Sequence, residues 1–186
     1  ANDQPQDFSR SVEELFLFYR DFRENLMPTI EKRYRTYAKS TDDIDLKNSR
    51  DHRFFSWFSL GAVTTWSQFE HNLQYISKFI PMSGDSWIEG IFSGRYKPRQ
   101  TVNSLEEIIE SSGLTNNDFH IFAGIGTVDP IWGQVGNQMQ AMMESRVFNR
   151  NNTSFWILQN GRHDLPACGC YLYHALKQII PYQSAE

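Results

Sequence analysis

Three residues of this chain, Ser59, Asp129 and His163, have the types and the order of a nucleophile, an acid and a base. A serine hydroxyl attacks a carbonyl carbon readily when a base takes its proton, and the imidazole that serves as base needs a carboxylate to fix its tautomer. Each of the three follows an apolar stretch typical of a buried strand. Because parallel strands present their carboxyl ends to one crevice, we expect these side chains to meet there as a catalytic triad.

Each member of this triad also has an ordinary alternative. Ser59 suits a helix cap, Asp129 before Pro130 suits a turn, and His163 suits a surface loop. For any one residue alone the ordinary alternative is the commoner one. The chain order serine, aspartate, histidine favours the triad, because it is the order found in hydrolases built on a parallel sheet.

The segment 53–66 predicts how Ser59 is presented. It runs from aromatic residues typical of a strand, through Ser59, into a segment with helical character. A serine on such a tight strand-to-helix turn stands clear of the sheet, and the N–H of the next residue, Leu60, points at the developing oxyanion. Gly61 supplies the small residue that lets the helix pack on the strand. Trp57 stands where a second glycine is usual, so the G-x-S-x-G motif of a nucleophile elbow is only half met.

Other side chains are weaker candidates for the site. Asp85 is the rival acid, and Asp164 is too close to His163 in the chain to be its partner. Trp57, Trp87 and Trp132 are candidates to stack on a sugar or phenolic ring, with core packing as the alternative. The other histidines are expected within helices or strands or before the first strand, namely His52, His71, His120 and His174.

Composition narrows the class of protein. With 186 residues the chain is long enough for one domain, and a net charge of −4 spread over both signs argues against a nucleic-acid binder. There is no apolar run of about 18 residues that would span a membrane. We find neither the spacing of metal ligands nor a cofactor motif, and no signal peptide is visible at the start. Cys168 and Cys170 are expected to be free thiols, because a disulfide closing so short a loop would be strained.

Strand-like and helix-like segments alternate along the chain. We expect a helix over 9–38 with a kink at Pro28, a loop over 39–51, and strands that end before Ser59 and over 76–82, 119–124 and 155–158. Further helices are expected over 61–72, 104–111, 135–148 and 171–180, with Ser104 as a cap, Gly113 as a stop, and Met139, Met142 and Met143 in the core. This alternation is the signature of a parallel α/β sheet.

Two stretches of this pattern carry a family resemblance. Residues 58–66 and 79–87 closely resemble the feruloyl esterase modules of bacterial xylanase complexes, in the esterase D-like group of α/β-hydrolases. The similarity runs from about Phe18 to Tyr182. It implies a single α/β-hydrolase-like domain over 1–186, with Ser59 as nucleophile, Asp129 as acid and His163 as base. It also implies a secreted enzyme that needs no cofactor and hydrolyses hydroxycinnamate esters of plant arabinoxylan through an acyl-enzyme.

The resemblance covers only part of that fold. The family's first strands and its glycine-rich oxyanion loop have no counterpart here, so we expect a partial α/β-hydrolase fold in which Leu60 is the oxyanion donor. The strand before Ser59 would then have a bare, apolar edge, which we expect to pair with a second copy or with a complementing chain. The alternative function is a catalytically impaired relic that binds carbohydrate or protein.

Overall fold

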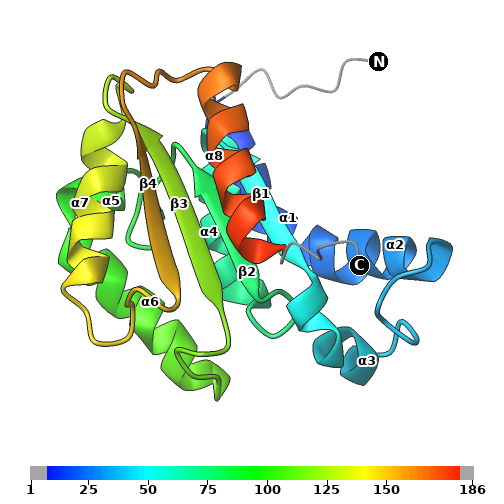
Figure 1. The fold of residues 1–186 in the computed structure, drawn as a ribbon. Coiled ribbons are helices and arrows are strands. Elements are labelled where there is room, and N and C mark those ends of the chain that lie inside the picture. The colour runs from blue at the N-terminus through cyan, green and yellow to red at the C-terminus, as the bar shows by residue number, and fades with distance from the viewer. Residues whose placement is uncertain (1–7, 181–186) are drawn as a thin grey trace, which may run out of the picture.

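The computed structural model describes residues 8–180, and its centre is a four-stranded sheet (Figure 1). The strands are β1 (Phe54–Phe58), β2 (Lys78–Met82), β3 (His120–Gly126) and β4 (Thr153–Leu158). They lie in the order β1-β2-β3-β4 and all pair in parallel, with Phe55 opposite Phe79 and Phe79 opposite Ile121. The predicted α/β class with a parallel sheet and flanking helices is therefore confirmed.

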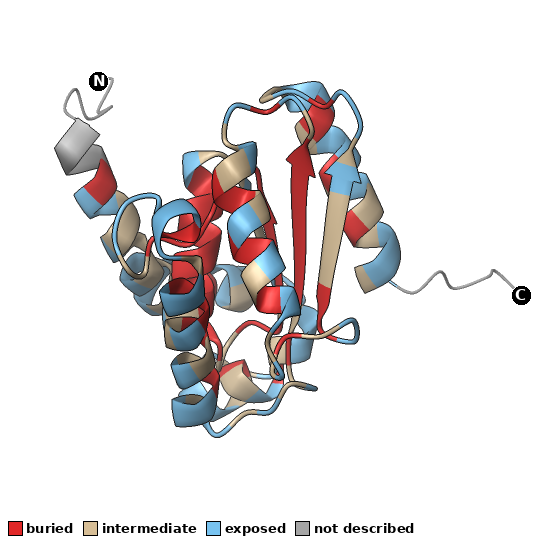
Figure 2. Ribbon diagram, turned by 90° about the vertical axis from the view of Figure 1, so that its left-hand side faces the viewer, coloured by how far each residue is buried: buried red, intermediate tan, exposed pale blue. Residues whose placement is uncertain are grey.

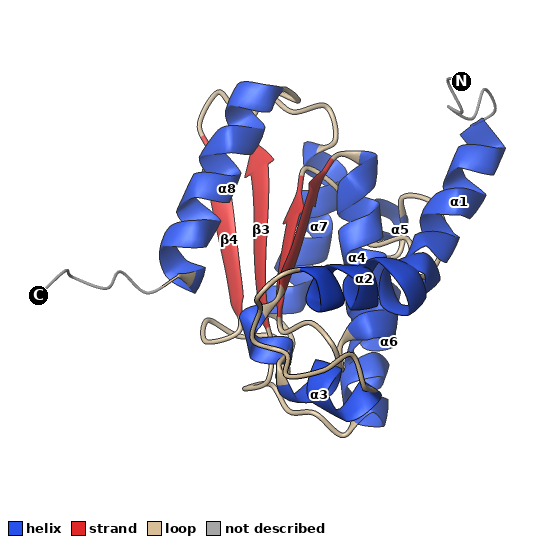
Figure 3. Ribbon diagram, turned by 90° about the vertical axis from the view of Figure 1, so that its right-hand side faces the viewer, coloured by secondary structure: helices blue, strands red, loops and turns tan. Residues whose placement is uncertain are grey.

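Helices cover both faces of this sheet. Helix α8 (Leu165–Ile179) packs on one face, and α4 (Leu60–Asn72), α6 (Pro98–Ser112) and α7 (Trp132–Met143) lie on the other (Figures 1 and 3). Burial follows these layers, since β2 and β3 and the inward sides of the helices are the buried parts (Figure 2). The larger core cluster is built around Trp66, Phe69 and Phe79 on the α4 side, and the smaller one around Ile80 and Tyr171 on the α8 side. Strands buried on both faces read as continuous apolar runs, which is why they were visible in the sequence.

The N-terminal helix bends before Pro28, as expected. Helix α1 (Phe8–Asp21) continues as a π-helical segment, Phe22–Leu26, and then as α2 (Met27–Arg33). The N–H of Met27 donates to the carbonyl of Phe22, five residues back. A proline has no N–H and its ring clashes with the carbonyl four residues earlier, so the wider turn accommodates Pro28 without ending the helical path.

The prediction of a loop over 39–51 was wrong. This segment contains α3 (Asp43–Asn48) and a 3₁₀ turn, Arg50–His52. Leu46 is buried and anchors α3, and Asp43 and Asp45 lie in its first turn, where acidic groups favour a helix. The high charge of the segment concealed a short helix with one buried residue.

Three other details differ from expectation. Helix α6 begins at Pro98, so Ser104 lies inside it and donates to Glu89 instead of capping, although Gly113 ends the helix with a φ of 73° as predicted. A short helix, α5 (Ser93–Tyr96), lies between β2 and α6, where the sequence pattern indicated no helix. Met139 and Met142 are buried, but Met143 is 44% exposed and is not part of the core.

Neither a membrane span nor a metal cluster is present in the described part of the chain. None of its helices is long and apolar enough to cross a bilayer. No group of three or more histidine, cysteine or acidic side chains in residues 8–180 is placed to hold a metal ion. Cys168 and Cys170 are both free thiols, as expected.

Glu70 in α4 makes folding stability depend on pH. It accepts a hydrogen bond from Ser86 Oγ at 2.8 Å, and burial raises the pKa of its carboxyl from 4.5 to about 7. The folded state therefore holds this proton more tightly than the unfolded chain does. We expect the stabilisation from protonated Glu70 to be complete below about pH 4.5 and to be lost as the pH rises through about 7.

The replacement Glu70→Gln should remove this pH dependence, because the amide resembles the protonated acid. The difference in unfolding free energy between wild type and variant should change by on the order of 1 kcal/mol across that range, since the residue is part-exposed. Urea unfolding at acidic and at weakly alkaline pH measures it, with exposed Glu110→Gln as the control. A parallel pH dependence of wild type and Glu70→Gln would contradict the assignment.

Candidate active site

Ser59 lies on a strained turn between β1 and α4. Its backbone has a φ of 61° and a ψ of −126°, which is unusual for a residue with a side chain. The turn is held because the Ser59 N–H donates to the Met82 carbonyl at 2.9 Å and the Ala62 N–H donates to the Ser59 carbonyl at 2.8 Å. This is the geometry of a nucleophile elbow, which lifts the serine hydroxyl away from the sheet.

Two glycines allow the close packing around the elbow. A Cβ on Gly61 would collide with Cγ of Trp57, and a Cβ on Gly84 would lie 2.7 Å from the Ser59 carbonyl oxygen. The sequence indicated the need for Gly61. The need for Gly84 appears only once β2 is placed beside β1.

The structure brings Ser59, His163 and Asp129 together. His163 Nε2 lies 2.7 Å from Ser59 Oγ, and His163 Nδ1 lies 3.0 Å from Asp129 Oδ2. The Asp129 side chain is fully buried, while that of His163 is 28% exposed. In this arrangement the imidazole accepts the serine proton on one nitrogen and donates to the carboxylate from the other.

Contacts between two loops fix the acid and the base. Asp129 follows β3, and Asp129 Oδ1 accepts a hydrogen bond from the Ile131 N–H at 3.0 Å. The Val128 N–H donates to the carbonyl of Gly161, two residues before His163. A Cβ on Gly126 would collide with that carbonyl oxygen. The sequence gives no signal for this loop contact beyond the two glycines themselves.

The backbone N–H of Leu60 is available to an oxyanion. Leu60 is the first residue of α4, so its N–H is among those that have no acceptor within the helix. The positive end of the helix dipole lies at the same place and favours developing negative charge.

The three tryptophans lie in different environments. Trp57 on β1 is 49% exposed and meets Phe18 edge-on at 6.0 Å, and Trp132, the first residue of α7, is 37% exposed and stacks against Phe155. Trp87 is only 5% exposed and packs in the cluster of Val12 and Val63. The prediction of Trp87 as a substrate contact was therefore wrong, because its indole is taken up by core packing.

The rival carboxylates have other roles. Asp85 is buried and accepts hydrogen bonds from the Trp87 indole at 3.1 Å and from the Gly94 N–H at 2.8 Å, and its burial raises the pKa of the carboxyl. Asp164 caps α8 by accepting from the Ala167 N–H. The remaining histidines make contacts elsewhere, with Tyr37, Tyr19, Ser154 and Trp156 as the partners of His52, His71, His120 and His174.

Trp57 fills space at the elbow without displacing it, since the Ser59–His163 contact is intact. We expect Gly61→Ala to destabilise the fold by about 1–3 kcal/mol, because the new methyl group overpacks against the indole. Trp57→Gly should lower stability, because it removes the indole that packs at the elbow. In the double variant the cost of Gly61→Ala should largely disappear. Chemical unfolding of the four proteins measures this coupling, and additive losses would show that the contact does not limit packing.

The fold and this site together define an α/β-hydrolase-like protein. The elbow serine, the aspartate and the histidine all follow strands of one parallel sheet, in the chain order of that class.

Comparison with known proteins shows which hydrolases this chain resembles. The chain is 33% identical over 165 residues to endo-1,4-beta-xylanase Y of Acetivibrio thermocellus. The matched residues are 86% of this chain and 15% of that protein. It matches a serine-to-alanine mutant of the feruloyl esterase module from Clostridium thermocellum complexed with sinapinate, at a TM-score of 0.81 and 29% identity over 92% of this chain. A second structure, of FAE, matches equally well at 30% identity. The resemblance to feruloyl esterase modules is confirmed.

These matches cover most of this chain but only part of the solved modules. The chain spans 62% of each of the two solved modules. A ferulic acid esterase matches with a TM-score of 0.58 at 20% identity, which supports the fold alone. No protein-family model matches the sequence.

Proposed function

We propose that this chain is a serine carboxylesterase of the feruloyl esterase kind. The observation that carries the proposal is the unbroken path from Ser59 Oγ to His163 Nε2, at 2.7 Å, and from His163 Nδ1 to the Asp129 carboxylate, at 3.0 Å. The similarity to feruloyl esterase modules supports the same class of reaction.

The proposed reaction has two halves. Ser59 Oγ attacks the ester carbonyl carbon while His163 takes the serine proton, and the carbonyl oxygen becomes an oxyanion beside the Leu60 N–H. The C–O bond to the alcohol then breaks, the alcohol leaves with the proton from His163, and the acyl group remains on Ser59. Water, deprotonated by His163, attacks the acyl-enzyme and releases the acid. Asp129 stabilises the imidazolium in both halves.

The proposed substrates are hydroxycinnamate esters of plant arabinoxylan. The solved module with sinapinate and the similarity to a xylanase chain support this substrate class. Trp132 and Trp57 are the exposed tryptophans available to stack on a phenolic or sugar ring, and the ring of Phe58 lies 4.7 Å from that of His163. Because the polysaccharide lies outside the cell, secretion is part of the proposal.

Turnover and covalent labelling test this function. The chain should hydrolyse methyl ferulate and p-nitrophenyl acetate, and an aryl organophosphonate should label Ser59 and stop turnover. Labelling should fail in His163→Ala and persist in the control His71→Ala, whose imidazole stacks on Tyr19 instead. The absence of both turnover above buffer and labelling of Ser59 would contradict the proposal.

The exposed edge of β1 is the proposed site of assembly. Within residues 8–180, β1 pairs only with β2, and Phe54 and Trp57 on it are 45% and 49% exposed. An apolar edge with unpaired backbone groups is a template for another strand, and a C2 homodimer is the simplest closed arrangement, with a complementing chain as the other occupant.

Light scattering at micromolar concentration should therefore give the mass of a dimer. Phe54→Lys should shift the chain toward monomer, because a charge on an edge strand opposes pairing. Phe92→Lys, at a similarly exposed aromatic residue outside the sheet, is the control. A monomeric wild type would contradict the dimer.

A further inference from the structure

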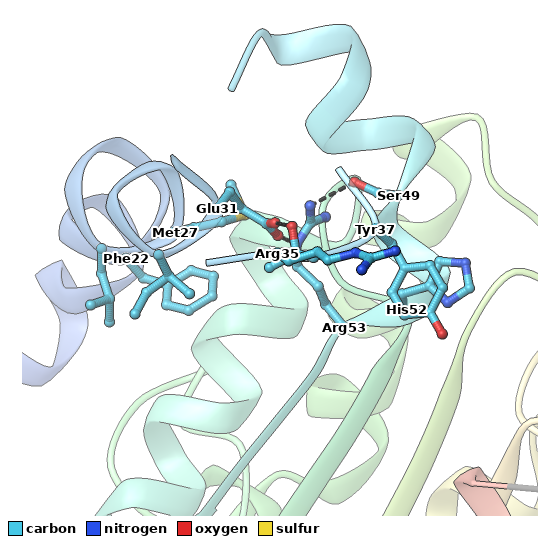
Figure 4. A pocket seen from close by; sticks show the side chains of 11 residues that line it. Phe22, Met27, Glu31, Arg35, Tyr37, Ser49, His52 and Arg53 are labelled. Atoms are coloured by element: carbon cyan, nitrogen blue, oxygen red, sulfur yellow. Dashed lines mark hydrogen bonds and ion pairs between the residues drawn. The ribbon is translucent and has the colours of Figure 1, made fainter. Parts of the chain in front are cut away.

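A cavity lies at the end of β1 opposite to Ser59. It has a volume of about 450 Å³ and is formed by the π-helical segment, α2, the residues after α2, and residues 49–53 (Figure 4). β1 separates it from Ser59, and a five-residue strand is about 16 Å long. The volume is within the range of small-molecule sites.

One wall of this cavity is apolar. It consists of Phe22, Leu26, Met27 and Ile30, which come from the π-helical segment and α2. Met27 is buried, whereas Leu26 and Ile30 are 42% and 43% exposed. Apolar side chains that remain this exposed around a cavity gain free energy when an apolar body covers them.

Two charged residues of the cavity, Glu31 and Arg53, are paired within the protein. The Glu31 carboxylate pairs with Arg53 Nε at 2.6 Å and also accepts from Thr36. The other Arg53 nitrogens donate to the carbonyls of Leu46 and Tyr75 and to Ser49 Oγ. This buried pair is neutral overall, and most of the Arg53 N–H groups are used within the protein.

Arg35 carries an unpaired charge in this cavity. It lines the cavity, and its guanidinium has no hydrogen-bond or ion-pair partner among residues 8–180. Figure 4 shows its side chain extending toward Tyr37 and His52. Those two rings stack face to face, 3.6 Å apart with 5° between their planes, and form a flat aromatic end to the cavity. The cavity thus combines apolar walls with one unpaired cation beside a planar aromatic surface.

We propose that this cavity binds a small aromatic monocarboxylate. The flat apolar body covers Leu26 and Ile30, and the carboxylate pairs with the Arg35 guanidinium, whose planar fork suits that group. Glu31 and Arg53 bind each other, which leaves Arg35 as the cation available to a single carboxylate. This site is separate from Ser59, and its existence does not depend on the proposed esterase activity.

Binding is tested with trans-cinnamate as the probe in a Ser59→Ala background. Isothermal titration should give saturable binding, and amide NMR shifts should change around residues 22–53. Arg35→Met should weaken binding about tenfold, the typical effect of losing one charge-assisted hydrogen bond. The matched control is Arg33→Met, because Arg33 lies over the Tyr34 ring and does not line the cavity. Ile30→Trp should abolish binding by filling the space.

Comparison of ligands separates the contributions. Cinnamyl alcohol, which has no charge, should bind more weakly than cinnamate, and octanoate, which is flexible and has no ring, should also bind more weakly. Equal affinity for the alcohol, or an unchanged affinity in Arg35→Met with an intact NMR spectrum, would overturn the role of Arg35. Tighter binding of octanoate would overturn the aromatic class. Shifts confined to the surroundings of Ser59, or no binding at all, would overturn the site.

Discussion

Replacement of Ser59 by alanine is expected to lower kcat for ester hydrolysis by about 10⁶-fold, the loss seen when the nucleophile of a serine triad is removed. Without Oγ there is no atom to form the proposed acyl-enzyme, and His163 loses its 2.7 Å partner. Steady-state hydrolysis of p-nitrophenyl acetate measures the loss. Ser56→Ala, on the same strand, is the matched control and should keep its activity.

The same substitution separates true catalysis from background reaction. His163→Ala should reduce kcat by a similar factor, and the double variant should be little worse than either single one, because the two residues act as a unit. Retention of more than a small fraction of the activity in Ser59→Ala would mean that another nucleophile is responsible.

Replacement of Asp129 by asparagine is expected to lower kcat by about 10⁴-fold, as it does in the trypsin triad. The amide keeps the shape but removes the negative charge that stabilises the imidazolium. The new amide group can also donate to Nδ1 of His163, which favours the tautomer whose Nε2 carries the proton and cannot accept from Ser59. Activity should recover in part at alkaline pH, where hydroxide or a serine alkoxide replaces the base.

Asp164→Asn is the control for the loss of a carboxylate near His163. Asp164 caps α8, and asparagine also caps helices well, so this variant should change both activity and stability little. Activity losses of equal size in the two variants would show that general charge, not the contact with His163 Nδ1, is what the carboxylate supplies.

Local sequence pattern was informative wherever burial was complete. β2 and β3 were visible as apolar runs because both of their faces are covered, and α4 was visible because it follows the elbow directly. The sequence pattern was misleading where a single residue stabilised a helix in a segment whose composition did not favour one. α3 lies in a charged segment and is anchored by Leu46. α8 begins at Leu165, six residues before its expected start, because Asp164 caps it there, although Gly169 lies within the helix.

The sequence by itself determined the α/β class, the strand-to-helix elbow at Ser59 and the chain order of Ser59, Asp129 and His163. These follow from periodicity and from residue type, which act over a few neighbouring positions. Only the tertiary structure decided which carboxylate meets His163, that Trp87 is buried, and that Arg35 is left unpaired in a cavity. Such outcomes depend on contacts between residues far apart in the chain. Asp129 and His163, for example, are 34 residues apart, and they are brought together by the pairing of β3 with β4 and by the contact between Val128 and Gly161.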